Sequence, residues 1–540
     1  MNDMKLGIGL DMRGGWNTDG AQWVPKDGTG RRPALVLDLE NNRGWYDGRT
    51  YATEAAALAA VGGTASGGTR KIGDHVATDA PELLPNGDLS LGIGDWTALN
   101  GATAAIVAGE LEMSGTGLTN PTVRSGAAST QQGKAYRAKA TYRKGTATGS
   151  PLVISSRSAT MSPLSNALAQ NASLVPTTFT RTFGGEGAAH YLGLRTVSGP
   201  GGTICGDSFS IKEATAFAGF SSPAFAVIIK FRVPANLPAS TRVLFSFDDD
   251  GARNRYRAAL NADGTITVTL DSNGTNRTTH VIASNLVTPG AGHTLHISSD
   301  GSSRFLVAFD ETHLYGQQAG FTPAGACWVR LGASPAAGEE WTGTILSAAL
   351  FAQEYAPPGF IWAIGDSYVA GTGGSSLEQG IETSNASRLV VSSGAGGSTV
   401  VAQLATMRSN PGLYGCVLVH WDGDANGANA ATDPATFESM ASLAARHVFV
   451  GSVRRMNHSA AEIATTNARN SWLSSRFGLR YIDPHPTLQA LATTSTEDLA
   501  ALAAGRAPPT CLQADGTHLT VAAMNAVSAA VLARIEALGW

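Results

Sequence analysis

Residues 360–371, FIWAIGDSYVAG, decide how the last third of the chain folds. The apolar run ends at Ile364 and is followed at once by Gly365, Asp366 and Ser367. A short apolar run bounded by glycine is typical of a buried strand, and glycine allows a sharp turn at its end. This stretch therefore predicts a strand that carries a serine hydroxyl at its carboxyl end.

Strand and helix patterns alternate after this stretch. Further strand candidates are RLVVSS, GCVLVHW, HVFVGSV and LRYID, and the helix candidates are GSTVVAQLATMRS, SAAEIATTNARNSWLSSRF and VAAMNAVSAAVLARIEAL. This alternation predicts a mostly parallel, doubly wound α/β sheet, whose ligands bind beyond the carboxyl ends of the strands. Pro357 and Pro358 mark its start, so we predict an α/β domain over residues 357–540.

Three more polar motifs fall at these strand ends. Residues 394–399 (GAGGST) follow the second strand, residues 421–426 (WDGDAN) follow the third, and residues 515–518 (DGTH) precede the last helix. Aspartate and histidine three apart on a turn can place the carboxylate against one ring nitrogen, so that the other nitrogen faces the serine. Each motif alone is no more than a common turn, and their order along the chain is the argument.

The four motifs together resemble the SGNH (GDSL) hydrolases over about 180 residues. This resemblance implies a flavodoxin-like fold and a serine esterase with Ser367 as nucleophile, His518 as general base and Asp515 orienting it. It also implies that the N–H groups of Ser367 and Gly397 stabilise the oxyanion.

The third block departs from the family, which reads G-x-N-D there. Ala425 stands at the expected asparagine and Asn426 follows it. We expect Asn426 to be the third oxyanion donor through a shifted turn; otherwise about 3 kcal/mol of transition-state stabilisation is missing. Asp422 and Asp424 would also be unfavourable near an oxyanion unless their charges point away.

Two other histidines compete for the role of base. His420 ends the third strand, and we expect it to be a packed core residue. His485 lies near Asp483 in IDPHP, and we expect that pair to belong to a structural loop.

The first two thirds predict three further units. Residues 79–215 and 216–356 show short alternating strands with turn signals, which predict two β-sandwiches. The first resembles jelly-roll carbohydrate-binding modules, and the second resembles concanavalin-like (laminin-G-like) sandwiches. Residues 1–78 predict a small module with a helix in TEAAALAAVGG and a linker over residues 62–69; part of it resembles bacteriophage tail and baseplate segments.

Composition excludes several classes of function. A formal net charge of −4 without a basic stripe predicts no nucleic-acid partner, and no apolar stretch is long enough for membrane insertion. The 4 cysteines form no CxxC pair, so we expect buried free thiols, no metal site and no cofactor. Asp248 to Asp250 could bind calcium, but a solvated hairpin end is the better interpretation. The first residues lack a secretion signal, which predicts synthesis in the cytoplasm of a host.

These expectations lead to one main hypothesis and two alternatives. The main one is a phage tail fibre or tailspike-like protein, carried in the virion tail, that binds a host surface polysaccharide and removes its O-acetyl groups. Its other partners would be phage tail or baseplate proteins, and analogy suggests a homo-oligomer such as a homotrimer. One alternative is a catalytically inactive SGNH domain in a receptor-binding or structural tail protein, which Ala425 favours. The other is a free bacterial carbohydrate esterase with accessory binding modules, which the missing secretion signal disfavours.

Overall fold

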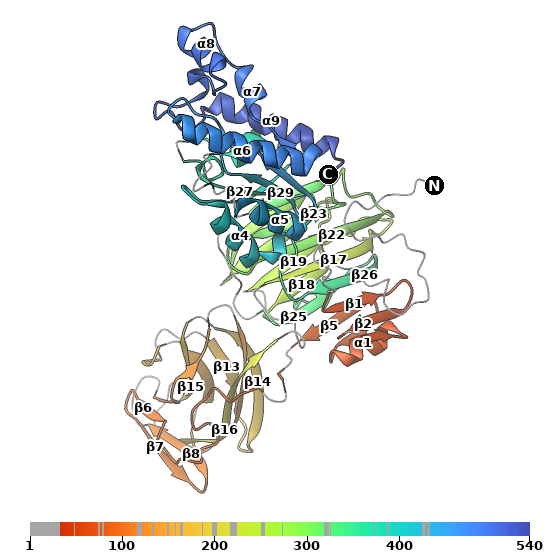
Figure 1. Cartoon of the computed structure of the whole chain (residues 1–540). Helices are drawn as coiled ribbons and strands as arrows, with labels where there is room; N and C mark the ends of the chain where they lie inside the picture. The colour runs from red at the N-terminus through yellow and green to blue at the C-terminus, as the bar shows by residue number, and fades with distance from the viewer. Residues whose placement is uncertain are drawn as a thin grey trace.

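A computed structural model of the chain shows two β-sandwiches and one α/β domain, with the second sandwich lying between the other two parts (Figure 1). It describes residues 33–540 except 48, 74–75, 78–79, 116–120, 132–133, 148–150, 157, 162–165, 186, 197–201, 216–223, 250–253, 273, 318–322, 324–325, 373, 386–387, 424–427 and 429–431.

The α/β domain has a parallel sheet of order β28-β27-β29-β30-β31, which confirms the predicted parallel sheet. Its strands are β27 (Ile361–Gly365), β28 (Val390–Gly394), β29 (Val417–Trp421), β30 (His447–Val450) and β31 (Tyr481–Ile482). Because the chain goes from β27 to β28 on one side and then to β29 on the other, the switch point lies between β27 and β29. In such sheets the ligand crevice lies at that point.

Helices cover both faces of this sheet. Val417 and Val419 bury one face against α3 and α9, while Trp362 and Leu418 bury the other against α4, α5 and α6. The helices are α2 (Ser367–Ala370), α3 (Leu377–Ser384), α4 (Val400–Ser409), α5 (Asp433–Leu443), α6 (Ala460–Phe477), α7 (His485–Gln489), α8 (Thr496–Ala503) and α9 (Val521–Ala537), with 3-10 turns η1 (Pro411–Leu413), η2 (Gly478–Arg480) and η3 (Pro509–Cys511).

The first sandwich joins two antiparallel sheets, β13-β12-β15-β9-β6 (with β10 beside β15) and β14-β11-β16-β8-β7. Its core includes Leu111, Tyr136, Leu194 and Ile211. The strands are β6 (Thr97–Leu99), β7 (Ala102–Val107), β8 (Glu110–Gly115), β9 (Thr122–Arg124), β10 (Ala128–Ser129), β11 (Ala135–Lys144), β12 (Pro151–Ser156), β13 (Asn166–Gln170), β14 (Thr177–Gly184), β15 (Ala189–Thr196) and β16 (Thr203–Ala214).

The second sandwich joins the sheets β24-β23-β22-β17-β26-β1-β2-β3 and β21-β20-β19-β18-β25-β5-β4. Its later strands are β17 (Phe225–Arg232), β18 (Arg242–Asp248), β19 (Arg255–Leu260), β20 (Ile266–Ser272), β21 (Thr275–Ile282), β22 (Gly292–Ser299), β23 (Phe305–Phe309), β24 (His313–Gln317), β25 (Trp328–Leu331) and β26 (Thr344–Phe351). The remaining members are β1 (Leu35–Asp38), β2 (Arg43–Tyr46), β3 (Arg49–Tyr51), β4 (Thr64–Ser66) and β5 (Thr69–Gly73).

The separate N-terminal module expected from the sequence is therefore wrong for its described part. Strand β1 pairs with β26, with Leu35 opposite Leu350, and β5 pairs with β25. All four residues of β1 are buried, so the strand needs partners on both edges and a core on its face. The predicted helix forms as α1 (Glu54–Ala60), but the predicted linker is the β4–β5 hairpin. Residues 1–32 of that module lie outside the described residues.

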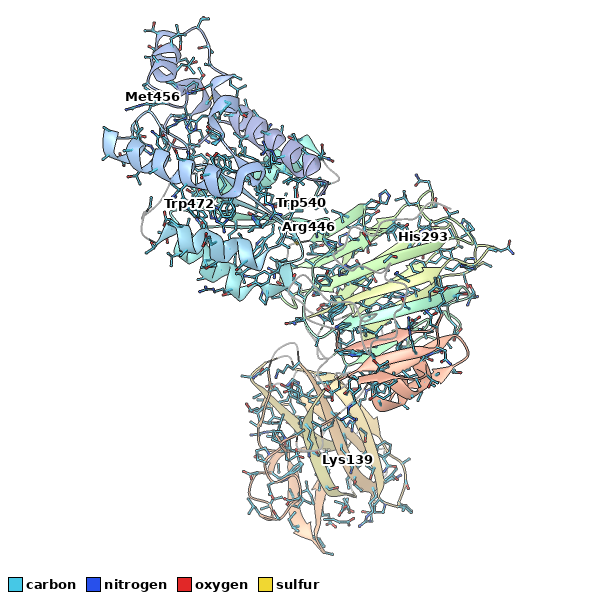
Figure 2. All side chains as sticks on the ribbon, turned by 45° about the vertical axis from the view of Figure 1, so that its right-hand side comes forward. Lys139, His293, Arg446, Met456, Trp472 and Trp540 are labelled. Carbon is cyan, nitrogen blue, oxygen red and sulfur yellow. The ribbon has the colours of Figure 1, made fainter. Side chains whose placement is uncertain are left out.

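The second sandwich and the α/β domain share a buried junction. Arg304, just before β23, forms an ion pair with Glu354 at 2.7 Å and donates to the Asn410 amide oxygen at 3.2 Å. Leu306 of β23 belongs to the same apolar cluster as Phe360. Figure 2 shows Arg446 of the α/β domain close to this junction. Polar and apolar contacts therefore both join the second sandwich to the α/β domain.

Candidate active site

Ser367 lies where strand β27 ends and helix α2 begins, and it is 7 % exposed. The Asp366 side chain caps this turn by accepting a hydrogen bond from the Tyr368 N–H at 3.1 Å. A Cβ on Gly365 would lie 1.9 Å from the Trp421 carbonyl oxygen, so only glycine lets the ends of β27 and β29 come this close. The local sequence thus places the serine at the switch point of the sheet.

The second block lies beside this turn. A Cβ on Gly394, the last residue of β28, would lie 2.3 Å from the Ala370 nitrogen, so glycine allows β28 to end against α2. Gly397 has φ of +69°, and a Cβ there would meet no atom within 4 Å. Within the described part of the chain, its N–H has no recorded hydrogen bond. The block therefore leaves the backbone N–H of Gly397 without an internal partner among the described residues.

The third block holds a buried aspartate whose charge is balanced. Asp422 contacts Arg469 of α6 at 2.5 Å, and the same guanidinium contacts Asp433 at 2.6 Å. All three residues are buried. Asp422 therefore does not present an uncompensated negative charge to an oxyanion. Asp424, Ala425 and Asn426, which include the expected third donor, lie outside the described residues.

The fourth block forms an aspartate–histidine pair. His518 Nδ1 lies 2.5 Å from Asp515 Oδ2, and the Asp515 Oδ1 atom accepts hydrogen bonds from the N–H groups of Thr517 and His518. The hydrogen bond from His518, together with these backbone bonds, lowers the pKa of Asp515 to about 2. A carboxylate at Nδ1 leaves the other ring nitrogen of His518 for a second partner.

Tyr368 connects the serine turn to the histidine loop. Its hydroxyl donates to the Thr517 carbonyl oxygen at 2.5 Å, and its ring centroid lies 6.1 Å from that of His518. Ser375 adds a second tie by donating to the Leu519 carbonyl oxygen at 2.9 Å. The described residues contain no hydrogen bond between the Ser367 hydroxyl and the His518 ring. The structure therefore brings the serine turn and the histidine loop together. Of the two hydrogen bonds expected in the triad, the described residues form the one between Asp515 and His518.

Sequence reasoning missed four residues that support the site: Tyr368, Ser375, Arg455 and Arg469. Besides Tyr368, Arg455 donates to the Thr517 hydroxyl at 2.7 Å and to His458 Nε2 at 2.8 Å, which braces the histidine loop. The sequence did indicate Arg455, because it follows the fourth strand, at the carboxyl ends of the strands where ligands bind. No sequence signal indicated a role for Arg469, because a cationic residue within a predicted helix is most often solvent-exposed.

The two rival histidines have structural roles. His420 is buried, its Nε2 lies 2.5 Å from the Gln403 side-chain oxygen, and burial lowers its pKa to about 3. His485 uses Nδ1 for Asp483 at 2.8 Å, and its Nε2 accepts from the Arg454 N–H at 2.9 Å. The prediction of a packed core histidine at 420 is confirmed.

No group of three or more histidine, cysteine, aspartate or glutamate side chains that could hold a metal occurs in the described residues. Asp248 is buried and pairs with Arg330 at 3.0 Å, so it is not the solvated hairpin end that the sequence suggested. The four cysteines are free and buried, as predicted. No helix in the described ranges is long and apolar enough to span a membrane.

The sequence matches no family model and no curated protein. Similar solved structures include a protein described as lipolytic and of the G-D-S-L family from Desulfitobacterium hafniense, with 12% identity, 33% of this chain and 99% of that chain covered, and a TM-score of 0.27. A CBM22-1 xylan-binding domain from Paenibacillus barcinonensis has 15% identity, coverage of 25% and 97%, and a TM-score of 0.22. The enzymatically active domain of bacteriophage CBA120 tailspike protein 4 has 10% identity, coverage of 24% and 21%, and a TM-score of 0.20. At these identities and TM-scores the similar structures carry no functional assignment.

Proposed function

We propose that residues 357–540 form a serine esterase in which Ser367 is the nucleophile, His518 the general base and Asp515 the residue that orients it. The 2.5 Å contact between Asp515 and His518 carries this proposal, because it fixes the imidazole beside the segment that follows β27. The Tyr368–Thr517 hydrogen bond supports it by holding the two segments together.

In this mechanism His518 Nε2 takes the proton of Ser367 Oγ as that oxygen attacks the ester carbonyl. The N–H groups of Ser367 and Gly397 stabilise the oxyanion, with the Asn426 side chain as the proposed third donor. His518 then gives its proton to the leaving alcohol, and water hydrolyses the acyl-enzyme by the reverse path. Asp515 remains ionised, as its lowered pKa favours, and stabilises the imidazolium.

We further propose that the whole chain acts on a surface polysaccharide, as a phage tail fibre or tailspike-like protein that removes O-acetyl groups. Two β-sandwiches joined to the α/β domain support this proposal, since they can hold a polymer near the esterase. In this setting the protein would be carried in the virion tail with other tail or baseplate proteins, as a homo-oligomer such as a homotrimer.

The test is hydrolysis of 4-nitrophenyl acetate by the full chain, beside Ser367→Ala and His518→Ala. We expect each substitution to lower kcat by on the order of 10⁴-fold or more. Ser439→Ala on α5 and His313→Ala on β24 are matched controls that should keep full activity. An unchanged rate for Ser367→Ala would overturn the assignment.

One observation favours a second candidate, a catalytically inactive receptor-binding or structural tail protein. Ala425 occupies the position of the family asparagine, so an oxyanion donor is missing unless Asn426 replaces it. Binding of an acetylated polysaccharide by the wild type, without release of acetate from it or from the aryl ester, would select this candidate.

A further inference from the structure

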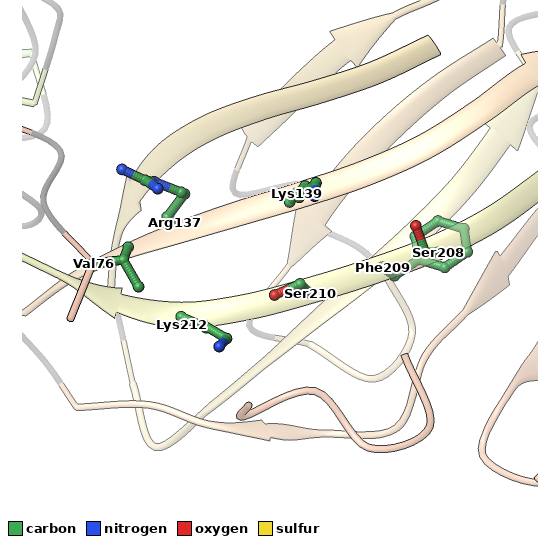
Figure 3. A pocket seen from close by; sticks show the side chains of 7 residues that line it. All are labelled: Val76, Arg137, Lys139, Ser208, Phe209, Ser210 and Lys212. Atoms are coloured by element: carbon green, nitrogen blue, oxygen red, sulfur yellow. The ribbon is translucent and has the colours of Figure 1, made fainter. Parts of the chain in front are cut away.

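A groove of about 270 Å³ lies on the outer face of the first sandwich (Figure 3). The first sandwich and the α/β domain lie at opposite ends of the molecule (Figure 1). Strands β11 and β16 form the floor of the groove, and Val76 of the segment connecting the two sandwiches lies at its side. The side chains of Arg137, Lys139, Ser208, Ser210 and Lys212 line it. Its lining is therefore cationic and hydroxylic.

The strand register concentrates these charges. Arg137 lies directly opposite Lys212 in the antiparallel pair, and Lys139 lies opposite Ser210. Cβ atoms of opposite residues are about 5 Å apart, and alternate residues along a strand are about 7 Å apart. Like charges placed directly opposite each other destabilise a sheet unless an anion offsets them. The register therefore gathers three cationic side chains on one face of the sheet.

Carboxylates of the sandwich do not neutralise the two lysines. Among the described residues, neither Lys139 nor Lys212 forms an ion pair, whereas Lys134 pairs with Glu213 at 3.0 Å. One carboxylate, Glu82, does lie beside the groove, where it accepts the Ser210 hydroxyl at 2.6 Å and the Ile211 N–H at 2.7 Å. The two oxygens of Glu82 bind β16, and the side chains of Lys139 and Lys212 remain in the lining.

The lining indicates which anion would bind. The ring of Phe209 is buried against Trp96, with centroids 4.6 Å apart, so it provides no platform for nucleic-acid bases. Val76 is the single aliphatic side chain of the lining and is half-buried, which does not favour lipid insertion. Serine hydroxyls between cations suit a chain that carries both hydroxyls and carboxylates. We propose that this groove binds an acidic, carboxylate-bearing polysaccharide.

This site goes beyond the proposed esterase, since it needs neither Ser367 nor an ester. The test is the affinity of the full chain for carboxymethyl-dextran, with dextran as the uncharged form of the same polymer, measured by calorimetry at low salt. We expect binding to carboxymethyl-dextran alone. Lys139→Gln with Lys212→Gln should weaken it about tenfold or more, because each lysine loses a charge-assisted hydrogen bond.

Two further double variants distinguish binding in the groove from a non-specific effect of positive charge. Lys134→Gln with Lys144→Gln removes the same charge from the same sandwich outside the groove and should leave the affinity unchanged. Lys139→Arg with Lys212→Arg keeps the charge and should retain binding. Equal losses in both glutamine variants would overturn the proposal.

A single-stranded oligothymidylate provides the competing macromolecule. Binding as tight as that of carboxymethyl-dextran, with the same dependence on Lys139 and Lys212, would overturn the assignment to a polysaccharide. Failure of the esterase assay together with groove-dependent binding would refute the catalytic proposal alone.

Discussion

The second sandwich and the α/β domain build their sheets from the chain in opposite ways. The α/β sheet takes its strands from one continuous stretch, in which each parallel pair is joined by a crossover within the domain. The second sandwich instead takes β1 and β5 from near the start of the described chain and pairs them with β26 and β25. The whole first sandwich, from β6 to β16, lies between these partners in sequence. Domain boundaries drawn along the sequence therefore hold for the first kind of sheet and fail for the second.

The largest effect is expected from removing the cation between two buried carboxylates. Arg469→Met takes the guanidinium from Asp422 and Asp433, and breaking such a buried network costs about 3–5 kcal/mol. Urea unfolding should show this loss in the α/β domain and leave the sandwiches unchanged, if the two regions unfold as separate units. Arg476→Met on the same helix is the control, because its pair with Glu438 is exposed and worth about 0–1 kcal/mol. Similar losses in the two variants would contradict the prediction.

A slightly smaller effect is expected at the N-terminal edge of the second sandwich. Leu37 of β1 is fully buried opposite Ala348, and Leu37→Ala should cost about 2–5 kcal/mol. Hydrogen exchange should then show reduced protection in β26 and β17, which follow β1 in the sheet. Leu91→Ala, at a side chain 72 % exposed, should change nothing. Unchanged protection of β26 in Leu37→Ala would restore the separate module that the sequence suggested.

Local sequence patterns predicted most helices and strands. They did not predict which strands pair in the second sandwich. The strand around Ile361 and the helix around Val521 appear where the apolar runs predicted them, because burial and capping act over a few residues. The LVLD strand at Leu35 was also visible as an apolar run. Its pairing with β26 was not predictable, because an antiparallel pairing between distant segments leaves no characteristic spacing in the sequence.

The candidate site was predictable in its polar motifs and not in its supports. Asp515 and His518 share one turn, so their contact follows from their spacing. The Tyr368–Thr517 hydrogen bond joins segments from opposite ends of the domain. Arg469 of helix α6 contacts Asp422, which follows strand β29. Such contacts depend on how helices cover the sheet, which no local pattern specifies.

Asn426→Ala tests the one departure of the α/β domain from the SGNH sequence pattern that it resembles. As the third oxyanion donor, Asn426 should contribute about 10²–10³-fold in kcat with little change in KM, because the bond strengthens in the transition state. Steady-state hydrolysis of 4-nitrophenyl acetate measures both constants. Asn429→Ala changes the same residue type three positions along the chain and should keep wild-type rates. Equal rates for the two variants would mean that the site works with backbone donors alone.

The smallest effect compares the acid sensitivity of the two regions. Burial lowers the pKa of His420 in the α/β domain to about 3 and that of His296 in the second sandwich to about 4, against 6.5 when solvated. Since the unfolded chain binds these protons first, the free energy of unfolding falls as the pH drops below about 6.5 and continues to fall until the folded pKa is reached. At pH 5.5 each histidine should account for about 1 kcal/mol of this loss. The measurement is urea unfolding of each variant at pH 8 and at pH 5.5. His420→Gln should remove this loss of unfolding free energy from the α/β transition alone. His296→Gln should remove it from the sandwich transition alone. A loss between the two pH values that stays the same in both variants would assign acid sensitivity to carboxylates instead.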